Sequence, residues 1–235
     1  MKVGILQTGH AHPEIQARHG PVDRWFHRLL DDLGFAFETW PVLEGVFPDS
    51  PLSADGWLVT GSEHGAYDAL AWIAPLEDFI REVAGLEHPL VGICFGHQVI
   101  AQALGGRVEK FEGGWAVGQQ RYRMGDASLV LNAWHQDQVV ARPPHARRVA
   151  TSDFCDNAIL AYDGNILTVQ AHPEFSEAHL ADMIRFRGAS VPEGVLADAR
   201  TRNGRRNDNA MLRELLATTL KAAPSPPRSR GRLDF

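Results

Sequence analysis

The chain has only two cysteines, Cys94 and Cys155, in 235 residues, and no long hydrophobic run. Two cysteines cannot build the disulfide framework of a small secreted scaffold, so a reducing compartment is expected. No apolar stretch approaches the roughly 20 residues that a membrane helix needs. The first residues read as a strand and lack the layout of a signal peptide. We therefore expect a cytoplasmic protein with no membrane partner.

An excess of positive charge is also missing. The 23 Lys and Arg residues are outnumbered by 29 Asp and Glu residues, which gives a net charge of −6 and a pI near 6.0. Nucleic-acid binding requires a basic stripe, and none is present in the part expected to fold, so no nucleic-acid partner is expected. With 44% hydrophobic residues, residues 1–222 should form one domain. The Pro- and Arg-rich tail, residues 223–235, is expected to be disordered.

Apolar segments with strand and helix periodicity alternate in the first half of the chain. Strands are expected at 3–6, 35–40, 57–60 and 90–94, and helices at 22–33, 76–84 and 97–104. This β-α-β order predicts an α/β fold with an open, mainly parallel sheet and helices on both faces.

Shorter strands are expected in the second half, at 117–124, 128–133, 147–152, 158–162 and 166–170. Asp163-Gly164-Asn165 predicts a hairpin turn between the last two, so this part should form a small antiparallel extension. Surface helices are expected at 177–187 and 209–222, with a basic connector at 200–206.

The most informative segment is Gly92-Ile-Cys94-Phe-Gly96, which lies between a predicted strand and a predicted helix. It is the cysteine form of the nucleophile elbow. An abrupt strand-to-helix turn strains the central residue and leaves no room for side chains two residues before and after it, so glycine fits both positions. The sulfur then lies at a helix N-terminus, where the dipole favours the thiolate. Taken alone, the segment fits a buried, inert cysteine equally well.

A second segment supplies a partner for this cysteine. Thr168-Val-Gln-Ala-His172-Pro-Glu174 predicts an apolar strand that ends in a histidine, with a carboxylate two residues further on. Residues i and i+2 of an extended segment face the same side. Glu174 would therefore orient the His172 ring, whose other nitrogen would face the nucleophile. His135 is the alternative base, but no carboxylate stands at a fixed position behind it.

Other residues that carry suitable chemistry are given structural interpretations. Cys155 is expected to be a bystander. His10, His12 and Glu14 are closely spaced, but no matching ligand pattern follows them, so no metal site is expected. The reaction considered below needs neither a metal nor an organic cofactor.

The elbow and the His172-Pro-Glu174 segment together resemble the class I glutamine amidotransferase family, whose triad is Cys, His and Glu. Two further segments are similar to it. Trp57-Leu-Val-Thr60-Gly61-Ser62 looks like the strand and loop that supply half of the oxyanion hole. The stretch 132–139, Asn-Ala-Trp-His-Gln-Asp-Gln-Val, resembles the one that lines the glutamine pocket. The pattern covers roughly residues 1–185 and implies a flavodoxin-like fold.

The resemblance implies a role for each matching position. Cys94 would be the nucleophile, His172 the general base and then acid, and Glu174 the orienting carboxylate. The backbone N–H groups of Ser62 and Phe95 would form the oxyanion hole. The implied substrate-binding residues are Gln98, Trp134, His135, Gln136 and Asp137. Ser62 and Gln136 stand where the family usually has glycine, and Trp134 where it has serine; these departures bear on the substrate, not on the reaction class.

The implied reaction is hydrolysis of a γ-glutamyl amide through a γ-glutamyl thioester on Cys94. Three functions remain open: a stand-alone hydrolase of glutamine or γ-glutamyl peptides, which is favoured; a glutaminase subunit that delivers ammonia to a separate synthetase; and a non-enzymatic binding or regulatory protein that retains the fold. The complete triad argues against the third. A docked synthetase predicts an apolar patch around the Cys94 mouth, whereas a stand-alone hydrolase predicts an open polar cleft.

Overall fold

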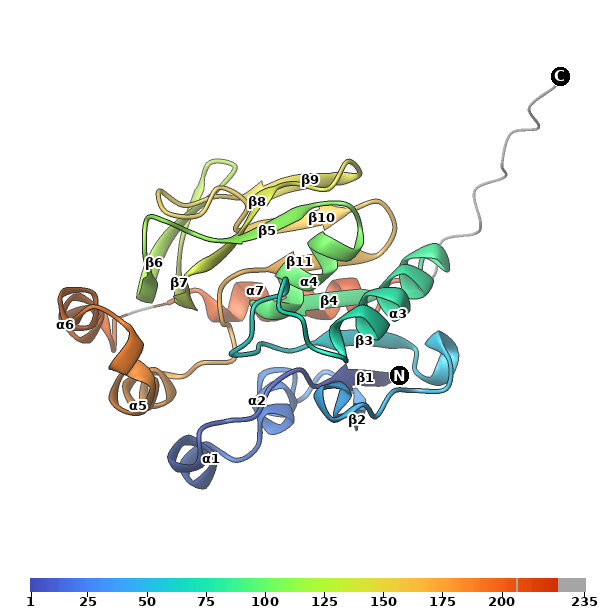
Figure 1. Ribbon diagram of the computed structural model, residues 1–235, viewed down its shortest axis with the longest axis horizontal. Coiled ribbons are helices and arrows are strands. Elements are labelled where there is room, and N and C mark those ends of the chain that lie inside the picture. The colour runs from blue at the N-terminus through green and yellow to red at the C-terminus, as the bar shows by residue number, and fades with distance from the viewer. Residues whose placement is uncertain (206, 224–235) are drawn as a thin grey trace, which may run out of the picture.

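The computed structural model describes residues 1–205 and 207–223 (Figure 1). All but the first residue of the predicted tail, 223–235, lies outside the described residues. A central sheet has the strand order β2-β1-β3-β4-β11-β10-β9. Its strands are β1 (Lys2–Leu6), β2 (Ala36–Trp40), β3 (Gly56–Val59), β4 (Leu90–Ile93), β9 (Ala146–Ala150), β10 (Ile159–Tyr162) and β11 (Ile166–Val169).

The sheet is parallel from β2 to β11 and antiparallel at its other edge, where β10 pairs with β11 and β9. The β10–β11 hairpin turns at Gly164, whose φ of +80° suits glycine. Two separate antiparallel pairs complete the strand structure: β6 (Ala116–Met124) with β7 (Ala127–His135), and β5 (Arg107–Lys110) with β8 (Asp137–Ala141). The predicted α/β fold with an antiparallel extension is confirmed.

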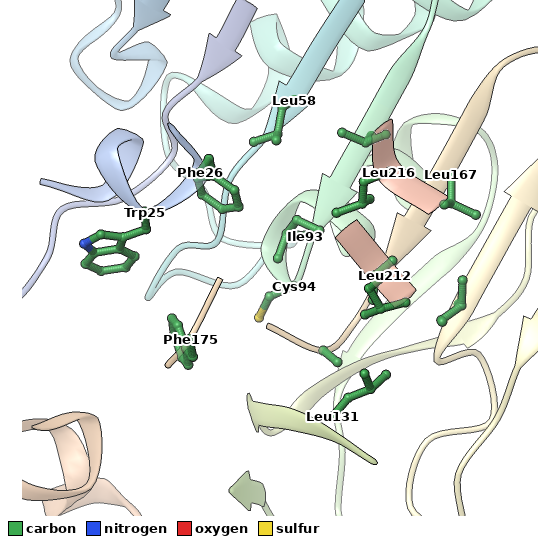
Figure 2. Packing of buried hydrophobic residues seen from close by; sticks show 14 of the residues in the cluster. Trp25, Phe26, Leu58, Ile93, Cys94, Leu131, Leu167, Phe175, Leu212 and Leu216 are labelled. Carbon is green, nitrogen blue, oxygen red and sulfur yellow. The ribbon is translucent and has the colours of Figure 1, made fainter. Parts of the chain in front are cut away.

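Helices cover both faces of the sheet (Figure 1). The α-helices described are α1 (Pro13–His19), α2 (Val22–Leu29), α3 (Ile73–Gly85), α4 (Phe95–Ala103), α5 (Glu177–Arg187), α6 (Glu193–Arg202) and α7 (Asn209–Leu220). Helices α2 and α7 cover one face of the sheet, and α3 and α4 cover the other. Because side chains alternate along a strand, Val91 and Ile93 of β4 pack with α2 and α7, while Leu90 packs with α3 and α4. Figure 2 shows the first of these cores, with Leu212 and Leu216 of α7 beside Ile93 and Cys94.

A third, smaller core joins α5 and α6 to the β6–β7 hairpin. Val117 of β6 packs with Leu180 of α5 and with Leu196 and Ala199 of α6. This contact fixes α5, which follows the His172-Pro-Glu174 segment, against the rest of the molecule. Within the described ranges, no helix combines the length and the apolar character that crossing a membrane requires.

Several element boundaries differ from the prediction. Helix α2 ends at Leu29, not at residue 33, because the chain turns at Asp32, whose φ is +64°. The predicted connector at 200–206 begins inside α6. Helices α1 and α6 and strands β5 and β8 were not expected. Helix α1 buries one residue, Ile15, and β5 buries one, so neither carries an apolar periodicity that a sequence could display.

Candidate active site

The turn from β4 into α4 is an elbow with Cys94 at its apex. Cys94 has φ 54° and ψ −102° and caps the N-terminus of α4, a strained conformation for a residue with a side chain. A Cβ on Gly92 would lie 2.6 Å from the carbonyl oxygen of Gly96, and one on Gly96 would collide with the carbonyl oxygen of Val59 in β3. The two glycines are therefore required by the close approach of β3, β4 and α4, as the elbow pattern predicts.

The Cys94 sulfur is almost enclosed. The residue is 7% exposed, and the Gln170 side-chain amide donates a hydrogen bond to its Sγ at 3.6 Å. Sγ also lies 3.9 Å from the backbone oxygen of Trp134. The contact from Gln170 was not foreseen. The available signal was its position two residues before His172, directly beyond the end of β11.

Glu174 and His172 are in direct contact. His172 Nδ1 lies 2.7 Å from Glu174 Oε1, and the two side chains are 7% and 2% exposed. The expected reason for this contact was wrong, since the segment is not extended: it forms a turn in which the Phe175 N–H donates to the His172 carbonyl at 3.3 Å. The turn, not strand alternation, brings the carboxylate back to the ring.

His172 and Cys94 meet beside Gly61. A Cβ on Gly61 would lie 3.3 Å from His172 Cε1 and 3.8 Å from Cys94 Cβ. Burial lowers the pKa of His172, but the Glu174 carboxylate and the nearby Cys94 sulfur outweigh burial and raise it to about 10. The imidazolium form of His172 is thus stabilised over the neutral ring.

A column of stacked rings holds His172 from its far side. The His172 ring stacks on Phe175 with 4.2 Å between centroids, Phe175 stacks on His179 at 4.4 Å, and His179 stacks on His19 at 4.6 Å. Asp182 closes the column, with its Oδ2 2.8 Å from His19 Nε2. The column links the elbow region to α1 and α5, and it restricts the His172 ring to one plane.

The two positions expected to form an oxyanion hole flank the elbow. Phe95 is the first residue of α4, and the N–H groups of the first turn have no partner within a helix. Ser62 follows β3 in a loop fixed by Thr8, whose hydroxyl donates to the backbone oxygen of Thr60 at 3.0 Å. The Ser62 hydroxyl accepts the His64 N–H at 3.2 Å.

A cavity of about 430 Å³ opens at Cys94. Of the residues predicted for the site, all but Phe95 line it: Ser62, Cys94, Gln98, Trp134, His135, Gln136, Asp137, His172 and Glu174. The side chain of Phe95 packs away from it, against Trp72, with ring centroids 5.5 Å apart. This leaves only the backbone of Phe95 for a role near the sulfur, which is the role that the resemblance implies.

A hydrogen bond joins the side chain of Gln98 to the backbone of Asp137. Gln98 Nε2 donates to the Asp137 backbone oxygen at 2.9 Å and to Gln170 Oε1 at 3.2 Å. Burial raises the pKa of the Asp137 carboxyl, and the Tyr67 hydroxyl donates to its Oδ2 at 2.9 Å. Tyr67 was not identified from the sequence, because its contact with Asp137 spans 70 residues and follows no local pattern.

The alternative residues have other surroundings. Burial and the neighbouring His172 lower the pKa of His135 to about 3, so its ring stays neutral. Burial raises the pKa of the Cys155 thiol to about 12. His10 Nε2 lies 3.1 Å from Glu44 Oε1, and His12 Nδ1 accepts the N–H of Glu14. Among residues 1–205 and 207–223, no group of three or more His, Cys, Asp and Glu side chains could hold a metal ion.

Comparison with known proteins gives a consistent picture. The family model "Glutamine amidotransferase class-I" matches residues 37–188. The chain is 31% identical to gamma-glutamyl peptidase 4 of Arabidopsis thaliana over 183 residues, which is 71% of this chain and 72% of the relative. It is also 31% identical to one subunit of the glutamine-hydrolyzing GMP synthase of Halobacterium salinarum, over 71% of this chain and 90% of that relative.

Solved structures share the fold. A glutamine amidotransferase from Methylobacillus flagellatus superimposes with a TM-score of 0.71 at 20% identity, over 93% of this chain and 92% of the other. One from Thermotoga maritima gives a TM-score of 0.70 at 20% identity, over 94% and 99%.

Proposed function

The chain belongs to the class I glutamine amidotransferase family, and from this premise we propose that it hydrolyses γ-glutamyl amides or peptides through a γ-glutamyl thioester on Cys94. The observation that carries the proposal is the position of the His172 ring. Its Nδ1 contacts Glu174 at 2.7 Å, while its Cε1 edge lies beside Gly61 and Cys94. A strained cysteine, a histidine and an orienting carboxylate in this order form a nucleophile, a base and its support.

The reaction begins with the proton of Cys94 on His172, where the Glu174 carboxylate stabilises the imidazolium. The thiolate attacks the γ-carbonyl carbon, and the oxygen that becomes negative is met by the backbone N–H groups of Phe95 and Ser62. Each such donor stabilises the transition state by about 3 kcal/mol. His172 then gives its proton to the leaving nitrogen, and the C–N bond breaks.

The second half of the cycle releases the acyl group. Water attacks the thioester carbonyl and transfers a proton to His172. The C–S bond breaks, glutamate leaves, and the thiolate with its imidazolium partner is restored. Glu174 keeps one orientation of the ring throughout, because its oxygen and the Phe175 stack fix both the ring nitrogen and the ring plane.

Stand-alone hydrolysis is favoured by the surface around the cavity. Among the described residues, the exposed large hydrophobic side chains are Met1, Val46, Leu52, Tyr67, Leu86, Val140 and Met211, and of these only Tyr67 lines the cavity. The lining combines apolar side chains, among them Trp25, Trp134 and Phe175, with charged ones: Glu63, Asp68, Lys110, Asp137 and Arg187. The relatives named as gamma-glutamyl peptidases support the same function. The relative from GMP synthase supports the alternative, a glutaminase that works with a synthetase.

Glutamate release by the purified protein tests the proposal. Glutamine and γ-glutamyl dipeptides are offered separately, with Cys94→Ala as the control for chemistry and thermal unfolding as the control for folding. Release from dipeptides by the wild type, absent in Cys94→Ala, supports a stand-alone hydrolase. If no substrate yields glutamate but a glutamine-like electrophile still labels Cys94, the synthetase-dependent alternative is supported. Full activity in Cys94→Ala contradicts the thioester mechanism.

A further inference from the structure

The cavity is lined by two sets of elements that belong to different parts of the molecule. One set surrounds Asp137: Lys110 is its neighbour across the β5–β8 pair, and Tyr67 donates to its carboxylate. The other set comes from α1, α2 and α5 and includes Ile15, Trp25, Met183 and Arg187. Figure 1 shows α1 and α5 together at one end of the molecule, away from β5 and β8.

The two sets suit the two ends of a γ-glutamyl dipeptide. The γ-glutamyl end carries an ammonium and a carboxylate, and the Asp137 region offers a carboxylate and the Lys110 ammonium. The second residue of the dipeptide carries a free carboxylate and a side chain. The α1–α5 region offers one guanidinium, Arg187, beside the apolar side chains of Ile15, Trp25 and Met183. Figure 2 shows that Trp25, Phe26 and Phe175 lie on one side of Cys94.

Arg187 is held at the cavity, but only part of its hydrogen-bonding capacity is used. Its Nη1 lies 2.8 Å from Glu63 Oε2, in the loop that follows Ser62, and the two side chains are 31% and 48% exposed. In the part of the chain that the structure describes, this is the one hydrogen bond found for the guanidinium. An arginine has five N–H donors in a planar fork, so Nε and Nη2 remain available for a bidentate carboxylate.

Resting on the proposed function, we propose that Arg187 binds the free carboxylate of the leaving amino acid. The substrate class is then γ-glutamyl dipeptides whose second residue is apolar and carries an unmodified carboxylate. Glu63 holds the guanidinium at the mouth of the cavity until the substrate arrives. Ile15, Trp25 and Met183 contact the side chain of the leaving residue, which is excluded from water there.

The chemistry allows this subsite to be measured by itself. γ-Glutamyl-leucine and γ-glutamyl-leucinamide differ in one group of the leaving residue, a carboxylate in the first and a neutral carboxamide in the second, and both give the same thioester on Cys94. A difference in kcat/KM between them therefore arises before the leaving group departs. We expect the wild type to prefer γ-glutamyl-leucine by roughly tenfold to hundredfold, the effect of a charge-assisted bidentate contact.

Arg187→Gln should reduce this preference to near unity by slowing only the carboxylate substrate. Arg187→Lys should restore part of it, since it keeps the charge but loses the fork. Arg185→Gln is the matched control: it removes the same charge from the same helix at an exposed residue outside the cavity lining, and it should keep the full preference. Thermal unfolding of each variant reports on folding.

Two results with Arg187→Gln would overturn the assignment of Arg187: an unchanged preference, or an equal loss on both substrates. A wild type that hydrolyses both substrates at the same rate also contradicts it while leaving the proposed function intact. A wild type that releases glutamate from neither substrate contradicts stand-alone hydrolysis and the leaving-group subsite together.

Discussion

Glu174 raises the pKa of the His172 ring. The ring is buried, and burial by itself lowers the pKa of His172; the carboxylate 2.7 Å away and the Cys94 sulfur reverse the direction and raise it to about 10. This environment favours the imidazolium form of His172 at neutral pH, which is the form that the proposed reaction pairs with the Cys94 thiolate. The nucleophile of the proposed reaction therefore depends on a residue that does not touch it.

Glu174→Gln removes the negative charge and keeps the size of the side chain. We expect kcat/KM for a γ-glutamyl dipeptide to fall by roughly 10²- to 10⁴-fold, because the imidazolium loses its support and the ring can take the wrong tautomer. The pKa of His172 should fall, so the alkaline limb of the pH–rate profile should move to lower pH. The measurement is kcat/KM between pH 5 and 10.5, with thioester formation followed by mass spectrometry.

Glu112→Gln, at an exposed position, is the control for loss of one negative charge and should resemble the wild type. A wild-type rate and pH profile in Glu174→Gln would mean that the carboxylate neither charges nor orients His172. Loss of rate with an unshifted alkaline limb would leave Glu174 an orienting role without an electrostatic one.

Local spacing predicted some residues of this site, while others depend on tertiary contacts. The glycines at 92 and 96 identify Cys94 because the steric demand of the elbow is local. Gln170 touches the Cys94 sulfur across 76 residues of sequence, and Tyr67 touches Asp137 across 70. Neither contact leaves a periodic or compositional trace. The contact between His172 and Glu174 was expected for a wrong reason, since a turn and an extended segment both bring residues two apart to one side.

At the scale of elements, the elbow is a junction of three backbones. Gly96 lies against Val59 of β3, and Gly92 lies against the first turn of α4. Phe95, whose N–H the proposed reaction uses, begins α4 directly after Cys94. The strength of the junction therefore affects both stability and catalysis.

Gly96→Ala should weaken this junction. The added methyl group collides with the Val59 carbonyl, which belongs to the central sheet and cannot move alone, so we expect a loss of about 1–3 kcal/mol in the free energy of unfolding. Activity should fall as well, because β3 carries the loop of Ser62. Gly194→Ala is the matched control: nothing lies within 4 Å of its added Cβ, and alanine favours helix α6 by up to about 1 kcal/mol. Urea unfolding distinguishes them, and equal stabilities would refute the crowded junction.

Elements with a buried face were predicted from the sequence, and those without one were not. Helix α3 buries Leu76, Ile80 and Val83 at helical spacing and was expected. Helix α6 buries only Leu196 and Ala199, and its arginine-rich end reads as a connector. Strand β5 depends on its pairing with β8 more than on the burial of its own side chains. Burial pattern, not helix or strand content as such, is the signal that a sequence carries.

On the scale of the whole molecule, three buried histidines couple folding to pH. His97 belongs to α4, and its Nδ1 lies 2.7 Å from the hydroxyl of Thr168 in β11. His135 ends β7, and His179 lies in the ring column. For each of them burial is the largest cause of a pKa lowered to about 3. They stay neutral in the folded protein, whereas in the unfolded chain they titrate near 6.5.

The unfolded chain therefore binds more protons than the folded protein between about pH 6.5 and pH 3, and stability is lost as the pH falls through this range. At pH 5 each histidine costs roughly 2 kcal/mol, so the three together can remove most of the stability of an ordinary domain. His172 acts in the opposite direction, since its raised pKa contributes stability that is complete below 6.5 and is lost only as the pH rises through about 10.

We therefore expect the free energy of unfolding, measured in urea, to fall steeply as the pH is lowered from 7.5 to 5. Its slope near pH 5 should correspond to about three protons taken up on unfolding. His179→Phe keeps a ring between Phe175 and His19 and removes one of the three groups, so its slope should be smaller by one proton. Both faces of the sheet and the α5–α6 core contain buried residues that become exposed together with these histidines. We therefore expect the protein to unfold in one cooperative transition. A slope that is flat from pH 7.5 to 5 would show that the histidines are protonated, or reached by water, in the folded state.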